Sequence, residues 1–355
     1  MSAPVLTGAV DADVHVAPAH LDVLTGYFDD YWRGYVVDGG VSLSPSQAGA
    51  YPPLAPTSAT PEARAAGLLP AAGTVDALRD ALLDPAGLAT AVLSCTSAFP
   101  VNRNPYYEAA LTRAVNDWLL EHWLAHDPRL RASIVVPSLD TGAAVAEIER
   151  VGGHPGVVGV LLPVRTDAPW GNVRHRPVLQ AAAEHGLVVG LHAWGRVGHA
   201  GTPSGLTHTY IEDYLTNSQV AAQAQLTSLV TEGAFAAVPD LRVTFLECGF
   251  SWLPALLWRF DKDWKGVWRE VPWVAGRPSQ IVREHVRFTT APAALPADPA
   301  RIREVLELLG GTDPLLWASD HPHDHGPGGQ WLLDALTDDE RTAVTRDNAV
   351  AWYGL

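Results

Sequence analysis

The feature that most constrains this chain is a series of short apolar runs that end in polar side chains. Eight such runs occur along the sequence. Several are almost unbroken stretches of valine, leucine and alanine, which is typical of parallel strands that are buried on both faces. We predict β-strands over residues 9–14, 89–94, 131–136, 157–161, 187–191, 242–246, 286–289 and 315–318.

Stretches with helical character separate most of these runs. Residues 106–126 are amphipathic and stop at Asp127-Pro128, and other stretches stop at glycine or proline, which commonly end helices. We predict helices over residues 106–126, 141–151, 177–185, 209–237, 299–309 and 338–353. Repeated alternation of strands and helices favours an α/β fold, a closed (β/α)8 TIM barrel. A doubly wound sheet is the alternative, but no Gly-x-Gly-x-x-Gly motif follows the first strand.

Two segments interrupt the alternation. Residues 18–75 follow the first strand and are rich in proline, alanine, glycine and serine. In a barrel such an insertion lies at the C-terminal mouth, so we predict a lid there. Residues 252–273 follow the sixth strand and are rich in aromatic side chains. We expect one barrel domain over residues 1–355, and the long insertions and 13 tryptophans lead us to expect a homodimer.

Composition excludes several classes of function. The 355 residues include 24 basic and 39 acidic side chains, a formal charge of −15. Such a charge repels phosphate backbones, so we expect no nucleic-acid partner. The two cysteines, Cys95 and Cys248, cannot build a disulfide framework and are interpreted as packing residues. Residues 1–16 lack the features of a signal peptide and no apolar run is long enough to span a bilayer, so we expect a cytoplasmic protein without a membrane partner.

Potential metal ligands lie where four of the predicted strands end. Asp13 and His15 end the first strand, and residues two apart on a strand point to the same face. His192 follows the fifth strand, Glu247 the sixth and Asp320 the eighth. Each alone has an ordinary structural explanation, such as a hydrogen-bonded surface histidine or a helix cap. Together they fall on the end of the barrel where such enzymes place their chemistry, so we predict a metal site.

Further candidates surround these strand ends. Glu212 begins the long helix, where it is either a metal ligand or an acid favoured by the first helical turn. His199 and His208 lie in the loop after the fifth strand. His323 is a plausible partner of the metal ligands. The other polar residues after Asp320 are interpreted as solvated loop positions: His321, Asp324 and His325.

At these residues the chain resembles the amidohydrolase superfamily, in the branch of aminocarboxymuconate-semialdehyde and resorcylate decarboxylases. The resemblance rests on Asp13-x-His15, on His192 and on the tail Ser319-Asp320-x-Pro322-His323. It covers nearly the whole chain, and it implies one divalent metal held by ligands from the first, fifth and eighth strands. Those decarboxylases carry a histidine as acid and base where this chain has Glu247.

A second, more specific resemblance is to an actinobacterial sub-branch that is similar to barrel-fold non-haem diiron monooxygenases. These include a hydroxylase of platensimycin and platencin diterpenoid biosynthesis. The shared motifs include Asn116-Asp117-Trp118-Leu119, Glu247-x-Gly249-x-x-Trp252-x-Pro254 and Glu270-Val271-Pro272-Trp273. The sub-branch usually has Glu-x-His where this chain reads Glu212-Asp213-Tyr214. One imidazole of a second metal site is therefore missing, unless His199 or His208 replaces it.

Three functions follow, and we favour the first. An iron-dependent monooxygenase of secondary metabolism would use two irons, dioxygen and an electron donor to hydroxylate a large apolar, terpenoid substrate that could be linked to CoA. Its metal ligands would be Asp13, His15, His192, Glu247 and Asp320, with Glu212 and His199 as candidates for the second iron. The carboxylate and imidazole ligands, without thiolate, suit iron, manganese or zinc, and surplus carboxylates favour two ions.

The alternative is a decarboxylase or hydrolase of a carboxylated small molecule, with one zinc or manganese ion. The ion would be bound by four ligands, Asp13, His15, His192 and Asp320. Glu247 would then carry the proton, with a pKa that burial raises. The third possibility, a non-enzymatic binding or scaffold protein, requires the strand-end ligands to be a coincidence.

Overall fold

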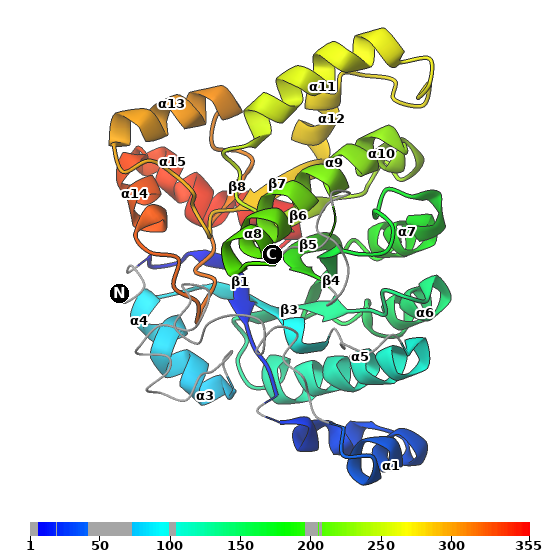
Figure 1. Ribbon diagram of the computed structural model, residues 1–355. Helices are drawn as coiled ribbons and strands as arrows, with labels where there is room; N and C mark the ends of the chain where they lie inside the picture. The colour runs from blue at the N-terminus through cyan, green and yellow to red at the C-terminus, as the bar shows by residue number, and fades with distance from the viewer. Residues whose placement is uncertain (1–5, 19, 42–72, 99–103, 196–204, 206–207) are drawn as a thin grey trace.

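The computed structural model describes residues 6–18, 20–41, 73–98, 104–195, 205 and 208–355. Eight parallel strands lie side by side in chain order, and helices surround them (Figure 1). This arrangement confirms the predicted TIM barrel. The strands are β1 (Val10–His15), β2 (Thr90–Ser94), β3 (Leu130–Val135), β4 (Val157–Arg165), β5 (Val188–Gly195), β6 (Val243–Leu246), β7 (Val286–Thr289) and β8 (Leu315–Leu316).

The segment that follows β8 joins the barrel to its first strand. β8 itself has two residues, shorter than the predicted 315–318. Its continuation still bonds to β1, because the Ala12 amide donates to the Trp317 carbonyl at 3.0 Å and the His15 amide donates to the His321 carbonyl at 2.8 Å. The Asp320 amide donates to the Asp13 carbonyl at 3.2 Å. Residues 317–321 are therefore held against the first strand, at the end where β1 leaves the barrel.

The helices agree with the predicted ranges to within a few residues, except where a local break divides them. The α-helices are α1 (Asp30–Asp38), α3 (Val75–Leu78), α4 (Asp84–Ala86), α5 (Pro105–Leu119), α6 (Thr141–Val151), α7 (Arg176–Glu184), α8 (Tyr210–Leu215), α9 (Ala221–Thr231), α10 (Ala234–Ala237), α11 (Leu253–Val267), α12 (Pro278–His285), α13 (Pro299–Leu309), α14 (Gly328–Ala335), α15 (Asp338–Thr342) and α16 (Asn348–Tyr353). The predicted helix 209–237 is interrupted at Gly233, whose φ of +71° suits glycine and ends the helical path.

Short turns of 3-10 or π geometry complete the helical structure. They are η1 (Leu21–Tyr27), η2 (Arg79–Leu83), η3 (Thr96–Ala98), η4 (Leu120–Leu124), η5 (Val173–His175), η6 (Thr216–Val220) and η7 (Ala343–Asp347). Several of them continue a neighbouring α-helix without a break, as η4 continues α5 and η6 joins α8 to α9. No helix in the described part of the chain is both long enough and apolar enough to cross a membrane.

The aromatic-rich insertion after β6 is mostly a helix. α11 stands on the outside of the barrel, beside α12 and α13 (Figure 1). Trp252, just before α11, packs its ring 5.6 Å from that of Phe288 and donates from Nε1 to the Cys248 carbonyl at 2.9 Å. Trp252 is thus partly buried against the core, whereas Trp258 on α11 is 58% exposed.

The described part of the predicted lid packs beside the barrel. η1 and α1 lie against α5 (Figure 1), where the Tyr27 hydroxyl donates to Glu121 Oε2 at 2.6 Å and the Trp32 ring lies 5.7 Å from that of Tyr107. The rest of the predicted lid, residues 42–72, lies outside the described residues. The lid, the single domain over 1–355 and the homodimer therefore stay predictions.

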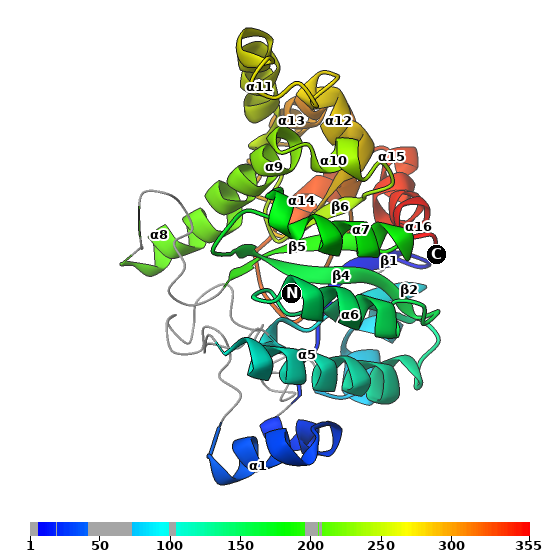
Figure 2. The ribbon, with the colours of Figure 1, turned by 90° about the vertical axis from the view of Figure 1, so that its right-hand side faces the viewer.

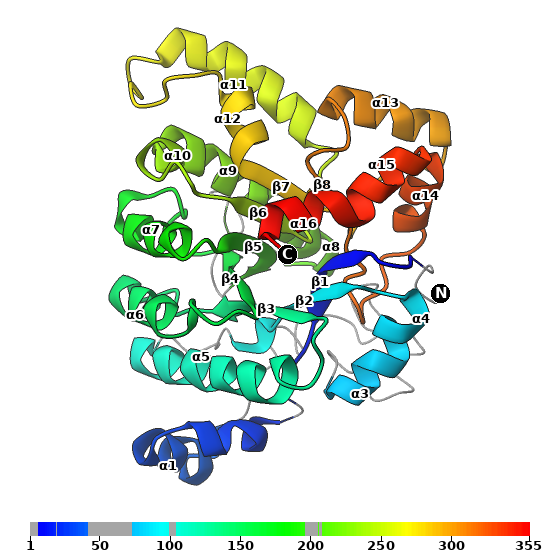
Figure 3. The same cartoon turned by 180° about the vertical axis from the view of Figure 1, so that it is seen from behind.

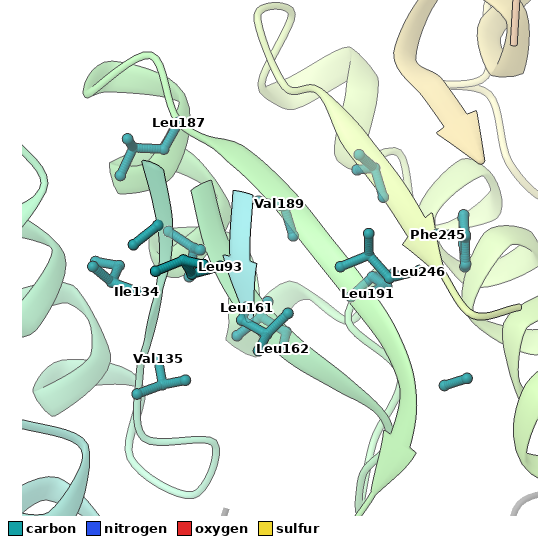
Figure 4. Close-up of a cluster of buried hydrophobic side chains, with 14 of the residues drawn as sticks. Leu93, Ile134, Val135, Leu161, Leu162, Leu187, Val189, Leu191, Phe245 and Leu246 are labelled. Atoms are coloured by element: carbon teal, nitrogen blue, oxygen red, sulfur yellow. The ribbon is translucent and has the colours of Figure 1, made fainter. Parts of the chain in front are cut away.

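The barrel core and its two ends have different roles. Leucine, isoleucine, valine and phenylalanine side chains from β2 to β6 fill the core (Figure 4). At the N-terminal end of the strands, Trp352 of α16 donates from Nε1 to Thr244 Oγ1 at 2.9 Å, and Arg287 lies over its ring at 4.2 Å. α16 covers this end (Figure 3), and α8 lies toward the other (Figure 2). The carboxyl ends of the strands are the end left for a site.

Candidate active site and metal centre

The structure brings the predicted strand-end residues together at the C-terminal mouth of the barrel. Two groups could each hold a metal ion, because their ligand atoms lie within 4.8 Å of one another. One consists of Asp13, His15, His192 and Glu247, and the other of His15, Glu247, Asp320 and His323. Residues far apart in sequence meet here because β1, β5, β6 and the segment after β8 all end at this mouth.

The first group contains buried polar atoms that face each other without hydrogen bonds. His192 Nε2 lies 3.5 Å from Asp13 Oδ2 and 3.2 Å from Glu247 Oε1. Among the described residues, neither His192 ring nitrogen nor Asp13 Oδ2 has a hydrogen-bond partner. The side chains of His192 and Asp13 are each 1% exposed, so bulk solvent does not reach these atoms. A buried polar atom without a partner is costly, and a cation between these atoms would satisfy them.

The second group is centred on Asp320. His15 Nε2 lies 2.8 Å from Asp320 Oδ1 and 2.9 Å from Glu247 Oε1. His323 Nδ1 lies 3.1 Å from the same Asp320 oxygen and 3.8 Å from Glu247 Oε1. The Asp320 side chain is fully buried, whereas that of His323 is 17% exposed. His323 is therefore the member of this group that solvent or a small molecule can reach.

The backbone is left-handed at two of these residues. Glu247 has a φ of +54° and Asp320 a φ of +56°, a conformation that residues other than glycine seldom adopt. Each falls where the chain leaves its strand. Hydrogen bonds hold both in place, since the Glu247 amide donates to Thr289 Oγ1 at 3.1 Å and the His323 amide donates to the Asp320 carbonyl at 2.8 Å. Strain of this kind is commonly kept at functional sites, where it directs a side chain.

Two polar residues that sequence reasoning missed support the ligands. Ser94, the last residue of β2, donates from Oγ to Asp13 Oδ1 at 2.6 Å. Asp11 Oδ1 accepts from the Ser319 amide at 3.0 Å and from the Asp13 amide at 3.3 Å, which ties β1 to the segment that carries Asp320. The available signal was position: Ser94 ends a predicted strand, and Asp11 shares a strand face with Asp13.

Proton binding at the site follows from the close packing of acids and imidazoles. Burial alone would lower the pKa of His192, but Glu247 and Asp13 outweigh it and raise that pKa to about 9. Burial likewise opposes the charged form of His15, yet Asp320 and Glu247 raise its pKa well above the usual range. In this arrangement the two imidazoles supply the positive charge that three buried carboxylates require.

Glu247 differs from the sequence-based expectation. Burial and the Asp320 carboxylate act to raise the pKa of Glu247, as expected. The imidazoles of His192 and His15 outweigh both and lower it to about 2. Glu247 is therefore an ionised carboxylate here, and the predicted raised pKa is wrong because sequence reasoning did not place two imidazoles against this side chain.

Glu212 lies apart from both groups. Its carboxylate accepts from the His208 amide at 3.3 Å and from Thr209 Oγ1 at 3.2 Å, so it stabilises the start of α8 at an exposed position. Thr209 in turn caps the helix, as its hydroxyl accepts from the Glu212 amide at 3.3 Å. This is the capping alternative that the sequence left open. His208 is exposed beside it, and His199 lies outside the described residues.

His325 was expected to be a solvated loop residue, and it is not. Its side chain is 9% exposed, and Nε2 contacts Asp320 Oδ2. The hydroxyl oxygen of Tyr214, on α8, lies 3.5 Å from His325 Nδ1. Asp320 is thus surrounded by His15, His323 and His325. Sequence reasoning missed this because the path of the loop after Asp320, and not the residue type, decides which histidine turns inward.

Known structures with a similar fold include decarboxylases of aromatic acids, some with bound manganese, and proteins described as amidohydrolases. A 2,6-dihydroxybenzoate decarboxylase bound to 2,6-dihydroxybenzoate has a TM-score of 0.69 and 19% identity over 99% of this chain and 100% of that one. The 5-carboxyvanillate decarboxylase of Sphingomonas paucimobilis has a TM-score of 0.71 and 20% identity over 99% and 100%. The manganese-bound dihydroxybenzoic acid decarboxylase of Polaromonas sp. JS666 has a TM-score of 0.66 and 18% identity over 99% and 98%.

The family comparison agrees with these structures and corrects the favoured function. The model of a family described as amidohydrolase matches residues 10–355. No curated protein matches the chain significantly. The prediction of an iron-dependent monooxygenase is wrong, because the similar structures are decarboxylases and fit the alternative that the sequence left open. The predicted oxidoreductase role in terpenoid antibiotic biosynthesis is therefore wrong as well. It had required dioxygen, an electron donor and a CoA-linked substrate. Two bound irons are not supported. Because the match spans nearly the whole chain, the protein belongs to the amidohydrolase family.

Proposed function

We propose that this protein is a metal-dependent decarboxylase of a small aromatic carboxylic acid. The observation that carries the proposal is the pair Asp13 Oδ2 and His192 Nε2, which are buried, face each other at 3.5 Å and have no hydrogen-bond partner among the described residues. A metal cation between the two atoms would satisfy both. The substrate class is proposed from the enzymes of similar fold, which act on hydroxylated or methoxylated benzoates.

The ligand set fits one manganese or zinc ion. Asp13, His15, His192 and Asp320 would hold it, since a mixture of carboxylates and imidazoles without thiolate suits these ions. His15 faces both ligand groups with the same nitrogen, Nε2. That nitrogen has one lone pair and binds one ion, which favours a single ion over two. When bound, the ion would polarise the substrate's carboxylate and offset its charge.

We propose that His323 carries the proton and that Asp320 orients its ring, beside the carboxylate of Glu247. Asp320 Oδ1 lies 3.1 Å from His323 Nδ1, so this nitrogen keeps its hydrogen and Nε2 becomes the atom that gains and releases a proton. Glu247 Oε1 lies 3.8 Å from the same Nδ1, on the side of the ring away from Nε2. His323 is exposed enough to regain a proton from solvent after each turnover.

Decarboxylation by these residues requires one proton transfer. The bond between the ring and its carboxyl carbon breaks, and the electron pair stays on the ring carbon. The proton from His323 Nε2 takes the place of the carbon dioxide that leaves.

The test is carbon dioxide release by protein loaded with manganese or zinc, with 2,6-dihydroxybenzoate and 5-carboxyvanillate as first substrates. We expect release that requires the added metal and that stops when a chelator removes it. Metal binding with no carbon dioxide release from any hydroxybenzoate tried, together with hydrolysis of an ester or amide, would replace the proposal with a hydrolase.

A further inference from the structure

Arg165, the last residue of β4, lies on the barrel's inner face. β4 and β5 pair in parallel with Pro163 opposite His192 and Arg165 opposite Gly195, and the register shifts between these two pairs because β5 has one residue more than β4 there. The extra residue lies on β5, so side chains still alternate along β4, and residues two apart on it point to the same face. Because His192 points into the site and Pro163 lies opposite it, Arg165, two residues beyond Pro163, points inward as well. It lies about 7 Å further along β4 than Pro163, at about 3.3 Å per residue.

Burial sets this arginine apart. Its side chain is 9% exposed, and no other arginine or lysine in the described ranges is as deeply buried. Arg165 Nη1 donates to Asp213 Oδ1 at 2.8 Å, and the Asp213 side chain is 19% exposed. Asp213 belongs to α8, so the ion pair joins the barrel wall to a helix beside the mouth. The free-energy cost of removing a guanidinium from water is offset only when a carboxylate binds it with good geometry.

The barrel mouth is strongly negative, which bears on how a carboxylate substrate can bind near Arg165. Three carboxylates, Asp13, Glu247 and Asp320, face the metal site, and the chain as a whole carries a formal charge of −15. One divalent ion leaves a charge of about −1 beside the imidazoles, so a substrate with a carboxylate is repelled unless another cation holds it. Arg165 is a cation beside the mouth whose charge Asp213 offsets in this structure, so a substrate carboxylate would compete with Asp213 for the planar guanidinium.

We infer that Arg165 binds a second carboxylate on the aromatic substrate, and that Asp213 holds the guanidinium in position until that group arrives. The inference rests on the proposed function and narrows it to aromatic dicarboxylic acids. The scissile carboxylate lies at the metal site, and the second lies toward the rim, where α8 supplies Asp213. Such a substrate is recognised at both ends of its ring.

The test compares the binding of benzoate with that of isophthalate and terephthalate. Dissociation constants are measured by calorimetry on manganese-loaded wild type, Arg165→Gln, Asp213→Asn and Arg174→Gln. Arg174 follows the same strand but is 45% exposed, so it serves as the matched control. Thermal unfolding of each variant shows that it is folded.

We expect wild type and Arg174→Gln to bind at least one dicarboxylate about tenfold or more tightly than benzoate, the effect of one good charged hydrogen-bonded pair. Arg165→Gln should lose this preference while keeping its affinity for benzoate. Asp213→Asn, which folds with Arg165 intact, should bind the dicarboxylate more tightly. Equal preference in Arg165→Gln and wild type, no preference in wild type, or unchanged or weaker binding in Asp213→Asn would overturn the inference.

Carbon dioxide release is measured separately on the same samples. A preference for dicarboxylates that depends on Arg165, without any carbon dioxide release, would contradict the proposed decarboxylase activity. It would still support the binding of a carboxylate by Arg165. Release of carbon dioxide from monocarboxylates and dicarboxylates at equal kcat/KM would contradict the binding role of Arg165. It would still support the proposed decarboxylase activity.

Discussion

Ser94 Oγ donates to Asp13 Oδ1 at 2.6 Å, so the other oxygen of the same carboxylate, Oδ2, is the one that faces His192. The two oxygens of Asp13 thus have separate partners. The first is fixed by the end of β2, and the second is left for a cation. A bond of this kind orients a ligand without touching the ion.

Removing the hydroxyl of Ser94 should therefore weaken metal binding without abolishing it. We expect Ser94→Ala to bind manganese about tenfold or more weakly than wild type, the usual effect of losing a ligand's supporting bond. Calorimetric titration measures this. Ser138→Ala is the matched control, since the Ser138 hydroxyl makes a similar buried bond to Glu108 at 2.9 Å away from the site. Equal manganese affinity in Ser94→Ala and wild type would show that Asp13 needs no such support.

Metal removal should have its largest effect through His192. Manganese at about a hundred times its dissociation constant should stabilise wild type by about 2.7 kcal/mol and raise its Tm by a few degrees. In His192→Ala the added manganese should leave Tm unchanged, because one ligand of the buried set is gone. His185→Ala, which removes a surface histidine paired with Glu149, should keep the full response. A response in His192→Ala equal to that of wild type would exclude His192 as a ligand.

His323→Gln separates proton transfer from metal binding. The proposed ligands remain, so manganese content should stay near that of wild type. Turnover should fall by about 10²- to 10⁴-fold, as expected for loss of a positioned proton donor. Asp324→Asn is the control, because Asp324 Oδ1 accepts from the Gly326 amide at 2.9 Å, a contact within its own turn. A His323→Gln enzyme with normal turnover would assign the proton to another group.

Glu247→Gln should also retain the metal while losing activity. The substitution keeps the shape of the side chain but removes the charge that faces His323 Nδ1 at 3.8 Å. We expect kcat to fall by about tenfold or more, because the negative charge that faces the proposed proton donor is lost. Metal analysis and steady-state rates on one preparation check both parts. Loss of manganese together with activity would instead make Glu247 a ligand.

Much of the barrel could be predicted because its strands are apolar runs with polar ends. β4 begins Val-Val-Gly-Val-Leu-Leu and is fully buried. The apolar run in the sequence is thus a direct consequence of the strand's burial on both faces. β8 could not be delimited, because residues 317–321 bond to β1 without forming a regular ladder. The helix α11 was predicted only as an aromatic-rich insertion. Trp252 packs against the core while Trp258 faces solvent, and which tryptophan is buried depends on the surrounding elements.

The site could be predicted where strand position alone determines which way a side chain points. Asp13, His15 and His192 meet because their strands end at one mouth. Residues in loops could not be placed in this way. Glu212 faces away because α8 uses it to satisfy its own first turn, and His325 turns inward because of the path of the loop after Asp320. Strand alternation gives no information on either.

His175 should make the stability of the fold depend on pH between about 4 and 6.5. It is 3% exposed and its ring lies 4.4 Å from that of Trp170. Burial, and then the adjacent Arg174, lower its pKa to about 4 from 6.5. Since the unfolded chain takes up the proton first, the stabilisation is complete above about pH 6.5 and is lost as pH falls toward 4. The loss should be about 2–3 kcal/mol.

The measurement is urea unfolding of wild type and His175→Gln at several pH values from 7.5 to about 4.5. Glutamine does not titrate, so the difference in unfolding free energy between the two proteins isolates this one proton. We expect that difference to be constant above about pH 7 and to change in favour of the variant as pH falls. His126→Gln, which replaces an exposed histidine, is measured in parallel as the control. A difference that is independent of pH would mean that His175 titrates alike in the folded and unfolded chain.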